Sequence, residues 1–469
     1  MVFSSLSFLL LFLPLLLILY FVIPNLRWKN AVLLVFSLVF YAWGEPVWIV
    51  CMLGATLVNW AVAFWIGRAK TAAAKRWILA IGVVASLAAL FWFKYAGFFL
   101  TNFYALFHIP AEAPSIRLPI GISFYTFQIL TYTVDVYRGK VPPQKSFFRL
   151  LLYVSCFPQL IAGPIVQYGD IAEQLEARTT HLVDFSEGMG RFAVGLGKKV
   201  LLANLCGKAV ETLLPGGAAL SVAGAWMSAV LYALQIYFDF SAYSDMAIGL
   251  GRVFGFRYRE NFNYPYLSGS ISEFWRRWHI SLGSFFREYV YIPLGGNRKG
   301  ALATARNLLI VWVLTGFWHG AEWNFLAWGL YYGVWILLER FVLQKLLERI
   351  PRWLRVLPTL LVVLIGWILF YHVSLAEGWR HIGALVGAGG LPLLDETALS
   401  VLHEYTVLPL IAVFCCLPIV PKCKAWMENR PALQRIASVA VPVLQTLLFA
   451  ASIAMLVGQS YNPFIYFRF

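Results

Sequence analysis

The sequence predicts an all-α polytopic membrane protein, and three observations lead to this fold class. Of the 469 residues, 61% are hydrophobic and only 13% are charged, which gives a mean hydropathy of +0.73. Apolar runs long enough to cross about 30 Å of hydrocarbon recur along the chain. The alternating pattern that barrel strands need is absent, so the spans are expected to be helices.

We therefore expect one transmembrane domain over residues 1–469, with roughly 11–13 spanning or re-entrant helices. The predicted spans cover residues 6–23, 31–43, 47–66, 77–100, 118–137, 150–166, 222–238, 307–318, 323–338, 360–371, 407–420 and 439–457. The stretch 191–214 is apolar but holds two lysines. Pro158 and Pro164 indicate that 150–166 is broken or re-entrant.

Basic linkers orient the chain. The net charge is +15, from 37 basic and 22 acidic residues, and the basic residues gather in linkers 67–76, 138–149, 340–355 and 422–435. Positive linkers face the cytoplasm, which places both termini and the net acidic loop 374–404 outside. Nucleic-acid binding is excluded, because the charges lie at helix ends and no soluble domain could carry a groove. The six cysteines form no paired zinc pattern, so no metal site or disulfide framework is expected.

One polar segment, residues 255–320, stands out within this apolar chain. Ser270 and Glu273 fit a capping box at the start of a predicted helix over 271–286. On this helix Glu273 and Arg277 are four residues apart and can pair. The same spacing places Trp275, His279, Leu282 and Phe286 on one face and Arg276 on another.

Each charged group in this segment has two interpretations. His279 is either a satisfied core histidine or a polar group lining a cavity. The arginines of the segment are either ordinary cytoplasmic charges or a docking surface for an anionic ligand, since guanidinium groups suit phosphates. Asp239 and Asp245, near the end of span 222–238, are candidates for buried pairing or polar lining, or mark an interfacial helix end.

His319 is the sharper signal. The apolar run 307–318 rises about 18 Å as a helix, which takes His319 past the midplane toward the outside, where ionisable groups usually face a cavity or a partner. Gly316 and Gly320 allow another backbone or a substrate to approach closely. An imidazole suits general-base work at neutral pH; the alternative is a histidine hydrogen-bonded between helices. The other histidines, at loops or span ends, are treated as background: His108, His181, His372, His381 and His403.

Several long motifs, in order, resemble the membrane-bound O-acyltransferase family, and within it the bacterial polysaccharide-acetylating branch of alginate O-acetyltransferase. They are LPIGISFYTFQ, FPQLIAGPI, YFDFSAYSDMAIGLG, ENFNYPY, SISEFWRRWHISL, REYVYIPLGGNRKG and FWHGAEWNFLAWG. The teichoic-acid D-alanylating branch shares the RWH and WHG elements. One departure follows GWILF, where this chain has Tyr371 and His372 instead of an Arg-Ala-like pair.

The resemblance implies a fold around a central tunnel in a bacterial inner membrane, and an O-acetyltransferase acting in exopolysaccharide O-acetylation. Acetyl-CoA would be the cytosolic donor, with no tightly bound cofactor and no metal. The acceptor would be a serine of an extracytoplasmic hydrolase-like partner, or a glycan hydroxyl. His319 would act as general base or transient acyl acceptor, and His279 would line the same tunnel. Further tunnel or donor-binding candidates are Trp275, Arg276, Arg277, Trp278, Trp318, Asn261, Asp239 and Asp245.

Two other functions remain open at this stage. One is D-alanyl transfer to teichoic acid. The other, of a different class, is a transporter for an envelope lipid or glycan, which would also need polar groups inside the membrane, although no matching halves are visible. For an acyltransferase, the two histidines can share a tunnel only if the segment with His279 dips into the membrane.

Overall fold

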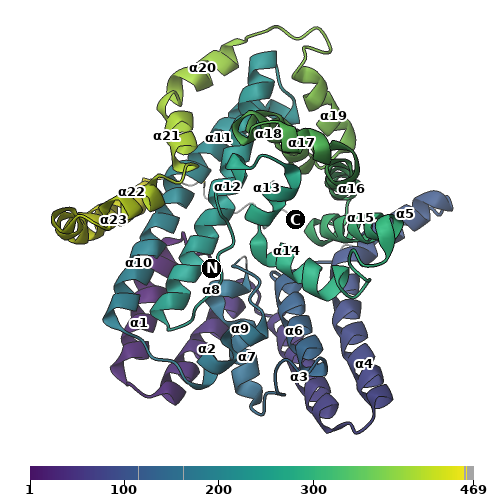
Figure 1. Cartoon of the computed structure of the whole chain (residues 1–469), viewed down its shortest axis with the longest axis vertical. Coiled ribbons are helices and arrows are strands. Elements are labelled where there is room, and N and C mark those ends of the chain that lie inside the picture. Colours follow the sequence, from purple (N-terminus) through teal and green to yellow (C-terminus); the bar gives the residue numbers. More distant parts are fainter. Residues whose placement is uncertain (115, 162, 459–460, 462–469) are drawn as a thin grey trace. The chain divides into compact units, whose positions relative to one another are not determined.

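The computed structural model describes residues 1–114, 116–161, 163–458 and 461 (Figure 1). Within this part of the chain every regular element is a helix. The chain divides into two compact units, the first of residues 1–192 and 244–259, the second of residues 193–243 and 260–469. Helices α10 (Leu182–Gly197) and α12 (Val222–Val253) contribute to both. A single transmembrane domain with a functional segment at 255–320 stays a prediction.

Six described helices are long and apolar enough to cross a membrane: Ile49–Arg68, Ala72–Leu106, Gly300–His319, Trp323–Arg349, Arg352–Tyr371 and Pro431–Gly458. A seventh span results if α20 (Glu396–Glu404) and α21 (Val407–Cys415), bent by 62°, cross together. Other predicted spans coincide with shorter helices, such as α1 (Leu13–Val22) and α6 (Ile122–Tyr137). The all-α, multi-pass membrane fold is thus confirmed. The extracytoplasmic termini stay a prediction, and residues 462–469 lie outside the described residues.

The first unit contains the N-terminal helices. Besides α1 and α6 these are α2 (Leu26–Gly44), α3 (Ile49–Arg68), α4 (Ala72–Leu90), α5 (Ala96–Leu106), α7 (Phe147–Ser155), α8 (Phe157–Leu160) and α9 (Tyr168–Glu176). Helices α3, α4 and α6 pack on one another and are joined by a buried hydrogen-bond network. The Thr133 hydroxyl donates to Asn59 Oδ1 (2.9 Å), and Asn59 Nδ2 donates to Ser86 Oγ (2.8 Å). Both ends of the amide are thereby satisfied.

The predicted span 150–166 is broken, as its prolines indicate. Helix α7 ends at Ser155, Cys156 is non-helical, and the four-residue α8 follows. The hydroxyl of Tyr153 donates to the Val166 carbonyl (2.8 Å), so a side chain satisfies a carbonyl that no helix uses. Residue 162, within this span, lies outside the described residues.

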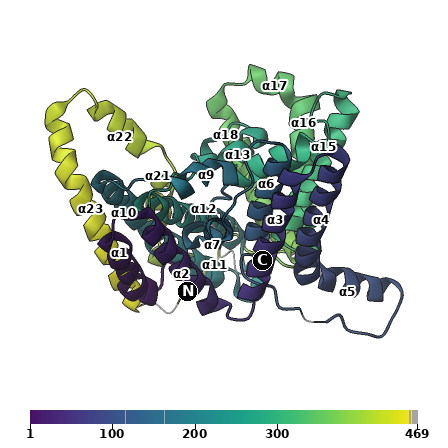
Figure 2. The same ribbon diagram turned by 90° about the horizontal axis from the view of Figure 1, so that it is seen from below.

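Helix α4 continues through the π-helical segment Phe91–Tyr95 into α5, and Figure 2 shows α5 running in a different direction from α4. A π-helical turn is a recognised cause of a bend. The predicted span 77–100 therefore belongs to a longer, bent helix. Most of this helix is exposed, as expected where lipid covers it.

The second unit holds most of the polar segment. Its helices are α11 (Asn204–Leu213), α13 (Ile271–Arg277), α14 (Ile280–Phe286), α15 (Gly300–His319), α16 (Trp323–Leu338), α17 (Gln344–Arg349), α18 (Arg352–Tyr371), α19 (Leu375–Ala384), α20, α21, α22 (Ile419–Met427) and α23 (Pro431–Gly458). Figure 1 shows α13, α14, α15, α16 and α18 grouped together in this unit.

Helices α15 and α16 approach each other through glycines. A Cβ atom on Gly316 would lie 2.3 Å from the carbonyl oxygen of Phe325, and one on Gly329 would lie 2.4 Å from that of Trp312. The close backbone approach predicted for Gly316 and Gly320 is confirmed for Gly316, whereas a Cβ on Gly320 would overlap the Phe325 ring at 2.2 Å. Gly316 meets a backbone, and Gly320 a side chain.

The predicted span 407–420 is wrong as a continuous helix. Helix α21 ends at Cys415, Pro418 lies outside any helix, and α22 begins at Ile419. Pro418 has no N–H to donate and disfavours helical geometry at the residue before it, and the apolar run is interrupted there.

Candidate active site

The predicted helix 271–286 is broken at His279, and the predicted shared face of Trp275, His279, Leu282 and Phe286 is therefore wrong. Helix α13 ends at Arg277 and α14 begins at Ile280, while His279 adopts the left-handed conformation with φ 48° and ψ 53°. Two backbone hydrogen bonds to the neighbouring segment 261–263 hold the chain in this broken form. The Asn263 N–H donates to the Arg277 carbonyl (2.9 Å), and the Ile280 N–H donates to the Asn261 carbonyl (3.0 Å).

Helix α13 begins with the predicted cap. Ser270 Oγ accepts from the Glu273 N–H (3.0 Å). In return, the Glu273 carboxylate accepts from the N–H of Gly269 (2.9 Å), one residue before the position that a capping box uses. A residue that sequence reasoning missed adds to this cap: the Glu339 carboxylate accepts from the N–H (2.8 Å) and hydroxyl (2.7 Å) of Ser272. Its only sequence signal was an acid at the end of the apolar run 323–338. Glu339 ties α13 to the chain that follows α16.

The arginines of α13 pair with an acid or are exposed. Glu273 pairs with Arg277 at 2.9 Å, as predicted, and also with Arg352 at 2.7 Å. Arg276 and Arg287 are exposed, as are the residues of the Arg298–Lys299 turn. All four of these cations lie on α13 or beyond α14, with their charges open to solvent or to an anion.

Asn261 determines which nitrogen of His279 carries the proton. Its Oδ1 accepts from the Ser281 N–H (3.1 Å) and from the Ser281 hydroxyl (2.8 Å), and it lies 3.2 Å from His279 Nδ1. Because a backbone N–H can only donate, the amide atom facing it is the oxygen. His279 Nδ1 must therefore donate, and Nε2 keeps its lone pair.

His279 is neutral and its second nitrogen is unused by the protein. The side chain is 2% exposed, and burial lowers the pKa of its imidazole to about 3. Among the described residues Nε2 has no hydrogen-bond partner. A buried acceptor without a donor costs about 1–3 kcal/mol, so this nitrogen is suited to a donor brought by a substrate.

The two histidines meet at Trp318. The centroid of the Trp318 ring is 5.7 Å from that of His279 and 4.9 Å from that of His319. His319, the last residue of α15, is buried. The structure therefore places both predicted catalytic residues beside one indole. We call His279, Trp318 and His319 the two-histidine site.

Aromatic side chains enclose this site. The His319 ring lies 5.0 Å from Trp328 and 5.2 Å from Phe370, in edge-to-face geometry. Trp275 lies 5.4 Å from Trp328. Trp278 packs edge-on against Phe262 and beside Trp367. The predicted tryptophans thus gather here, whereas sequence reasoning missed Trp328 and Phe370, which carry no signal in an aromatic-rich chain.

The two candidate aspartates are paired, as one of their interpretations predicted, but not in the two-histidine site. Asp239 lies 2.6 Å from Lys199 Nζ, with both side chains buried. Its neighbour Phe240 contacts the His279 ring at 4.6 Å. Asp245 belongs to the first unit and accepts from Arg191 at 2.7 Å.

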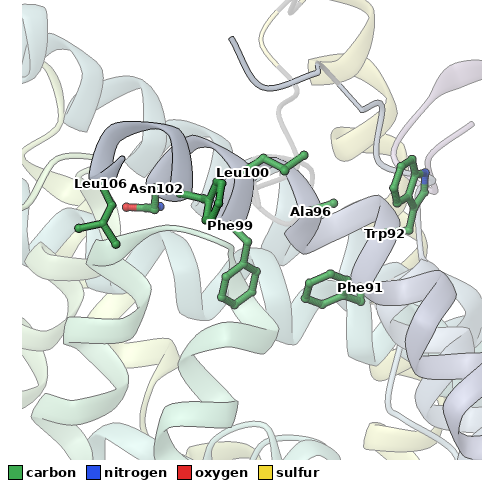
Figure 3. A pocket seen from close by; sticks show the side chains of 8 residues that line it. Phe91, Trp92, Ala96, Phe99, Leu100, Asn102 and Leu106 are labelled. Atoms are coloured by element: carbon green, nitrogen blue, oxygen red, sulfur yellow. The ribbon is translucent and has the colours of Figure 1, made fainter. Parts of the chain in front are cut away.

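A pocket in the first unit has a different character. Figure 3 shows side chains of the α4–α5 bend pointing into it, and its lining contains no ionisable group: Phe91, Trp92, Ala96, Phe99, Leu100, Asn102, Phe103 and Leu106. Such a lining suits hydrocarbon and offers no acid–base chemistry. No cluster of three metal-ligating side chains is found in the described part of the chain either.

Comparison with known proteins identifies the family of this chain. Residues 91–376 match the model of the membrane-bound O-acyltransferase family. The chain is 41% identical to a probable alginate O-acetylase of Azotobacter vinelandii and 40% identical to that of Pseudomonas aeruginosa, each over the full length of both chains. It is 35% identical to a peptidoglycan O-acetyltransferase of Helicobacter pylori, over 84% of this chain and 81% of the relative.

The chain therefore belongs to the membrane-bound O-acyltransferase family. It is a multi-pass membrane enzyme, and its full-length similarity to O-acetylases supports an O-acetyltransferase. A buried histidine at the end of a spanning helix, beside a second neutral histidine, is chemically suited to such a transfer.

Proposed function

We propose that this enzyme moves an acetyl group from cytosolic acetyl-CoA through the membrane to an extracytoplasmic hydroxyl, for O-acetylation of an exopolysaccharide. The observation that carries the proposal is the meeting of His279 and His319 at Trp318. His319 ends a helix long enough to cross the membrane. The segment with His279 is the short broken pair α13–α14, and its contact with Trp318 supports a path shared by the two histidines.

The transfer needs a base for the acceptor hydroxyl. In the proposed reaction the hydroxyl proton passes to His319 while its oxygen attacks the thioester carbonyl; the C–S bond then breaks, and His319 returns the proton to the sulfur. His279 Nε2, an acceptor, is available to a different N–H or O–H of the donor or acceptor molecule, because the single proton of the reacting hydroxyl goes to His319. Exclusion of water by the surrounding aromatic rings protects the acetyl group from hydrolysis. A transient acetyl group on His319 is a variant of the same chemistry.

Two indole N–H groups are suited to the developing oxyanion. Nε1 of Trp275 and of Trp328 is buried and has no hydrogen-bond partner among the described residues. The Trp328 ring lies 5.0 Å from that of His319. A carbonyl oxygen becomes a stronger acceptor as it gains charge, so donors of this kind stabilise the transition state more than the ground state.

The donor and the acceptor are assigned to opposite faces. Exposed Arg276, Arg287, Arg298 and Lys299 supply charge for the phosphates of acetyl-CoA on the cytosolic side. The acceptor is a serine of an extracytoplasmic hydrolase-like partner or a glycan hydroxyl. Relatives named for alginate and peptidoglycan support an envelope glycan as the final product. This orientation puts the enzyme in a bacterial inner membrane, with both termini outside.

Substitution of His319 tests the proposal. His319→Ala should abolish acetyl-CoA turnover and remove acetyl groups from the glycan, as measured by mass spectrometry. His403→Ala, at an exposed histidine of the same unit, is the matched control. Unchanged acetyl-CoA turnover in His319→Ala would overturn the proposed role of His319, and absence of acetyl-CoA turnover in the wild-type protein would favour a transporter. Turnover of a D-alanyl donor in place of acetyl-CoA would favour the D-alanylating reaction.

A further inference from the structure

Two more histidines form a buried bridge in the second unit. His372 directly follows α18, and His381 lies on α19; Figure 1 shows these two helices. The side chains are 3% and 4% exposed, and His372 Nε2 lies 2.9 Å from His381 Nδ1. At its other nitrogen, His381 Nε2 lies 3.1 Å from the Ala225 carbonyl and 3.3 Å from Ser228 Oγ, both on α12.

The partners limit how many protons this bridge can hold. A carbonyl can only accept, so His381 Nε2 carries a proton. In the neutral pair, His381 Nδ1 then accepts from His372 Nε2–H. One extra proton can be placed on His372 Nδ1, which lies 3.8 Å from the Glu377 carboxylate. A second extra proton would set N–H against N–H across the 2.9 Å contact, and the bridge would break.

The bridge is connected to the two-histidine site. The backbone carbonyl of His372 accepts from Asn324 Nδ2 (2.9 Å), and Asn324 lies near the start of α16, five residues after His319. Phe370, two residues before His372, contacts the His319 ring at 5.2 Å. Movement of His372 would therefore displace both a ring that packs on His319 and the turn that follows it.

Few other groups near the bridge carry charge. Glu377 and Arg380 belong to α19 itself, while α12 contributes Ala225 and Ser228, and α16 contributes only the Asn324 amide. Burial, with the charge of His381 and Arg380, lowers the pKa of His372 to about 4. Burial also lowers the pKa of His381, opposed by its bond to the Ala225 carbonyl. Both imidazoles are therefore neutral at pH 7.

We propose that His372 and His381 form a proton-sensitive bridge that positions the His319 turn, closed while the pair holds at most one extra proton and open when it binds a second. The two histidines are positioning residues, since their connection to His319 runs through Phe370, which contacts its ring, and through Asn324, which follows it in the chain. The effect on acetyl transfer rests on the proposed function, whereas the bridge itself does not.

Two substitutions at His372 separate a titrating bridge from simple packing. Glutamine places an amide near the position of Nε2 and can either donate to or accept from His381. His372→Gln should therefore keep the bridge closed both at pH 7 and in acid. His372→Leu removes it. At pH 7 we expect kcat to stay within about twofold of wild type in His372→Gln and to fall on the order of tenfold in His372→Leu, with the KM for acetyl-CoA unchanged. His403→Gln serves as the control.

Hydrogen–deuterium exchange tests the bridge without activity. In wild type, protection factors over residues 316–330 and 372–385 should fall below pH 4, where a second extra proton follows the first, and in His372→Gln they should fall less. Equal acid opening in both proteins would overturn the proposal, as would wild-type kcat in His372→Leu. If His372→Leu does not fold, the exchange of His372→Gln still decides. If neither wild type nor any variant transfers acetyl, the proposed function fails, and the exchange result still tests the bridge by itself.

Discussion

At His279 the chain holds a backbone conformation that costs about 1–2 kcal/mol for an L-residue with a side chain. The cost is offset by four hydrogen bonds from the facing segment, two of them to the side-chain oxygen of Asn261. This arrangement turns the imidazole toward Trp318 and fixes its tautomer. Strain of this kind persists where the surroundings over-determine it, and it is common at functional sites.

Substitution of Asn261 should separate positioning from folding. Asn261→Leu removes the acceptor that fixes His279, and we expect kcat for acetyl transfer to fall on the order of tenfold to a hundredfold. Asn261→Asp keeps the acceptor and should retain more activity. Its carboxylate should raise the pKa of His279, so the loss of activity on acidification should begin at a higher pH. Identical kcat values and pH profiles for the two variants would contradict the assigned role.

Acid should destabilise the fold through His279. Its pKa is about 3 in the folded state and about 6.5 when unfolded, so the unfolded chain binds more protons between these values. The contribution of neutral His279 to the free energy of unfolding is fully present above pH 6.5 and is lost as the pH falls toward 3. Between pH 7 and pH 5 the loss is about 2 kcal/mol for this group. Unfolding in detergent measures it, and His279→Gln should show a shallower pH dependence; an equal dependence would refute the buried neutral state.

At the scale of elements, the spacing of residues predicted local contacts correctly but did not predict where the helices break. The cap at Ser270 and the Glu273–Arg277 pair are local, so the sequence around them was sufficient. The break at His279 was not predictable, because it depends on the backbone at 261–263, which no periodicity in 271–286 encodes. The break between α21 and α22 coincides with Pro418, but Pro358 and Pro442 lie inside α18 and α23, so a proline alone does not determine where a helix ends.

The contact between α15 and α16 gives a prediction about packing. Gly316→Ala would put a methyl group against the Phe325 carbonyl, and the helices must separate, at a cost of about 1–3 kcal/mol in the free energy of unfolding. Gly54→Ala in α3 is the control, since nothing lies within 4 Å of its Cβ position; alanine there should be neutral or stabilising by up to about 1 kcal/mol. Similar losses in both variants would argue against a specific close approach.

At the scale of the molecule, composition sufficed for the fold class and the histidine motifs sufficed for the two catalytic candidates. Their meeting at Trp318 was stated only as a geometric requirement, since it depends on long-range packing. His372 and His381 were set aside as background. They are nine residues apart, His372 directly after α18 and His381 on α19, and only the folded chain brings their rings into contact. Asp239 and Asp245 were singled out for their depth, but each has a basic partner of its own.

A vesicle assay with donor and acceptor on opposite faces tests the central claim most directly. Labelled acetyl-CoA is supplied only at the face that carries the basic linkers, and a hydroxyl acceptor is enclosed at the other face. We predict that label reaches the enclosed acceptor with the wild-type enzyme and with His403→Ala, and does not with His319→Ala. Equal labelling with His319→Ala, or labelling only of an acceptor on the donor's own face, would contradict transfer through the two-histidine site.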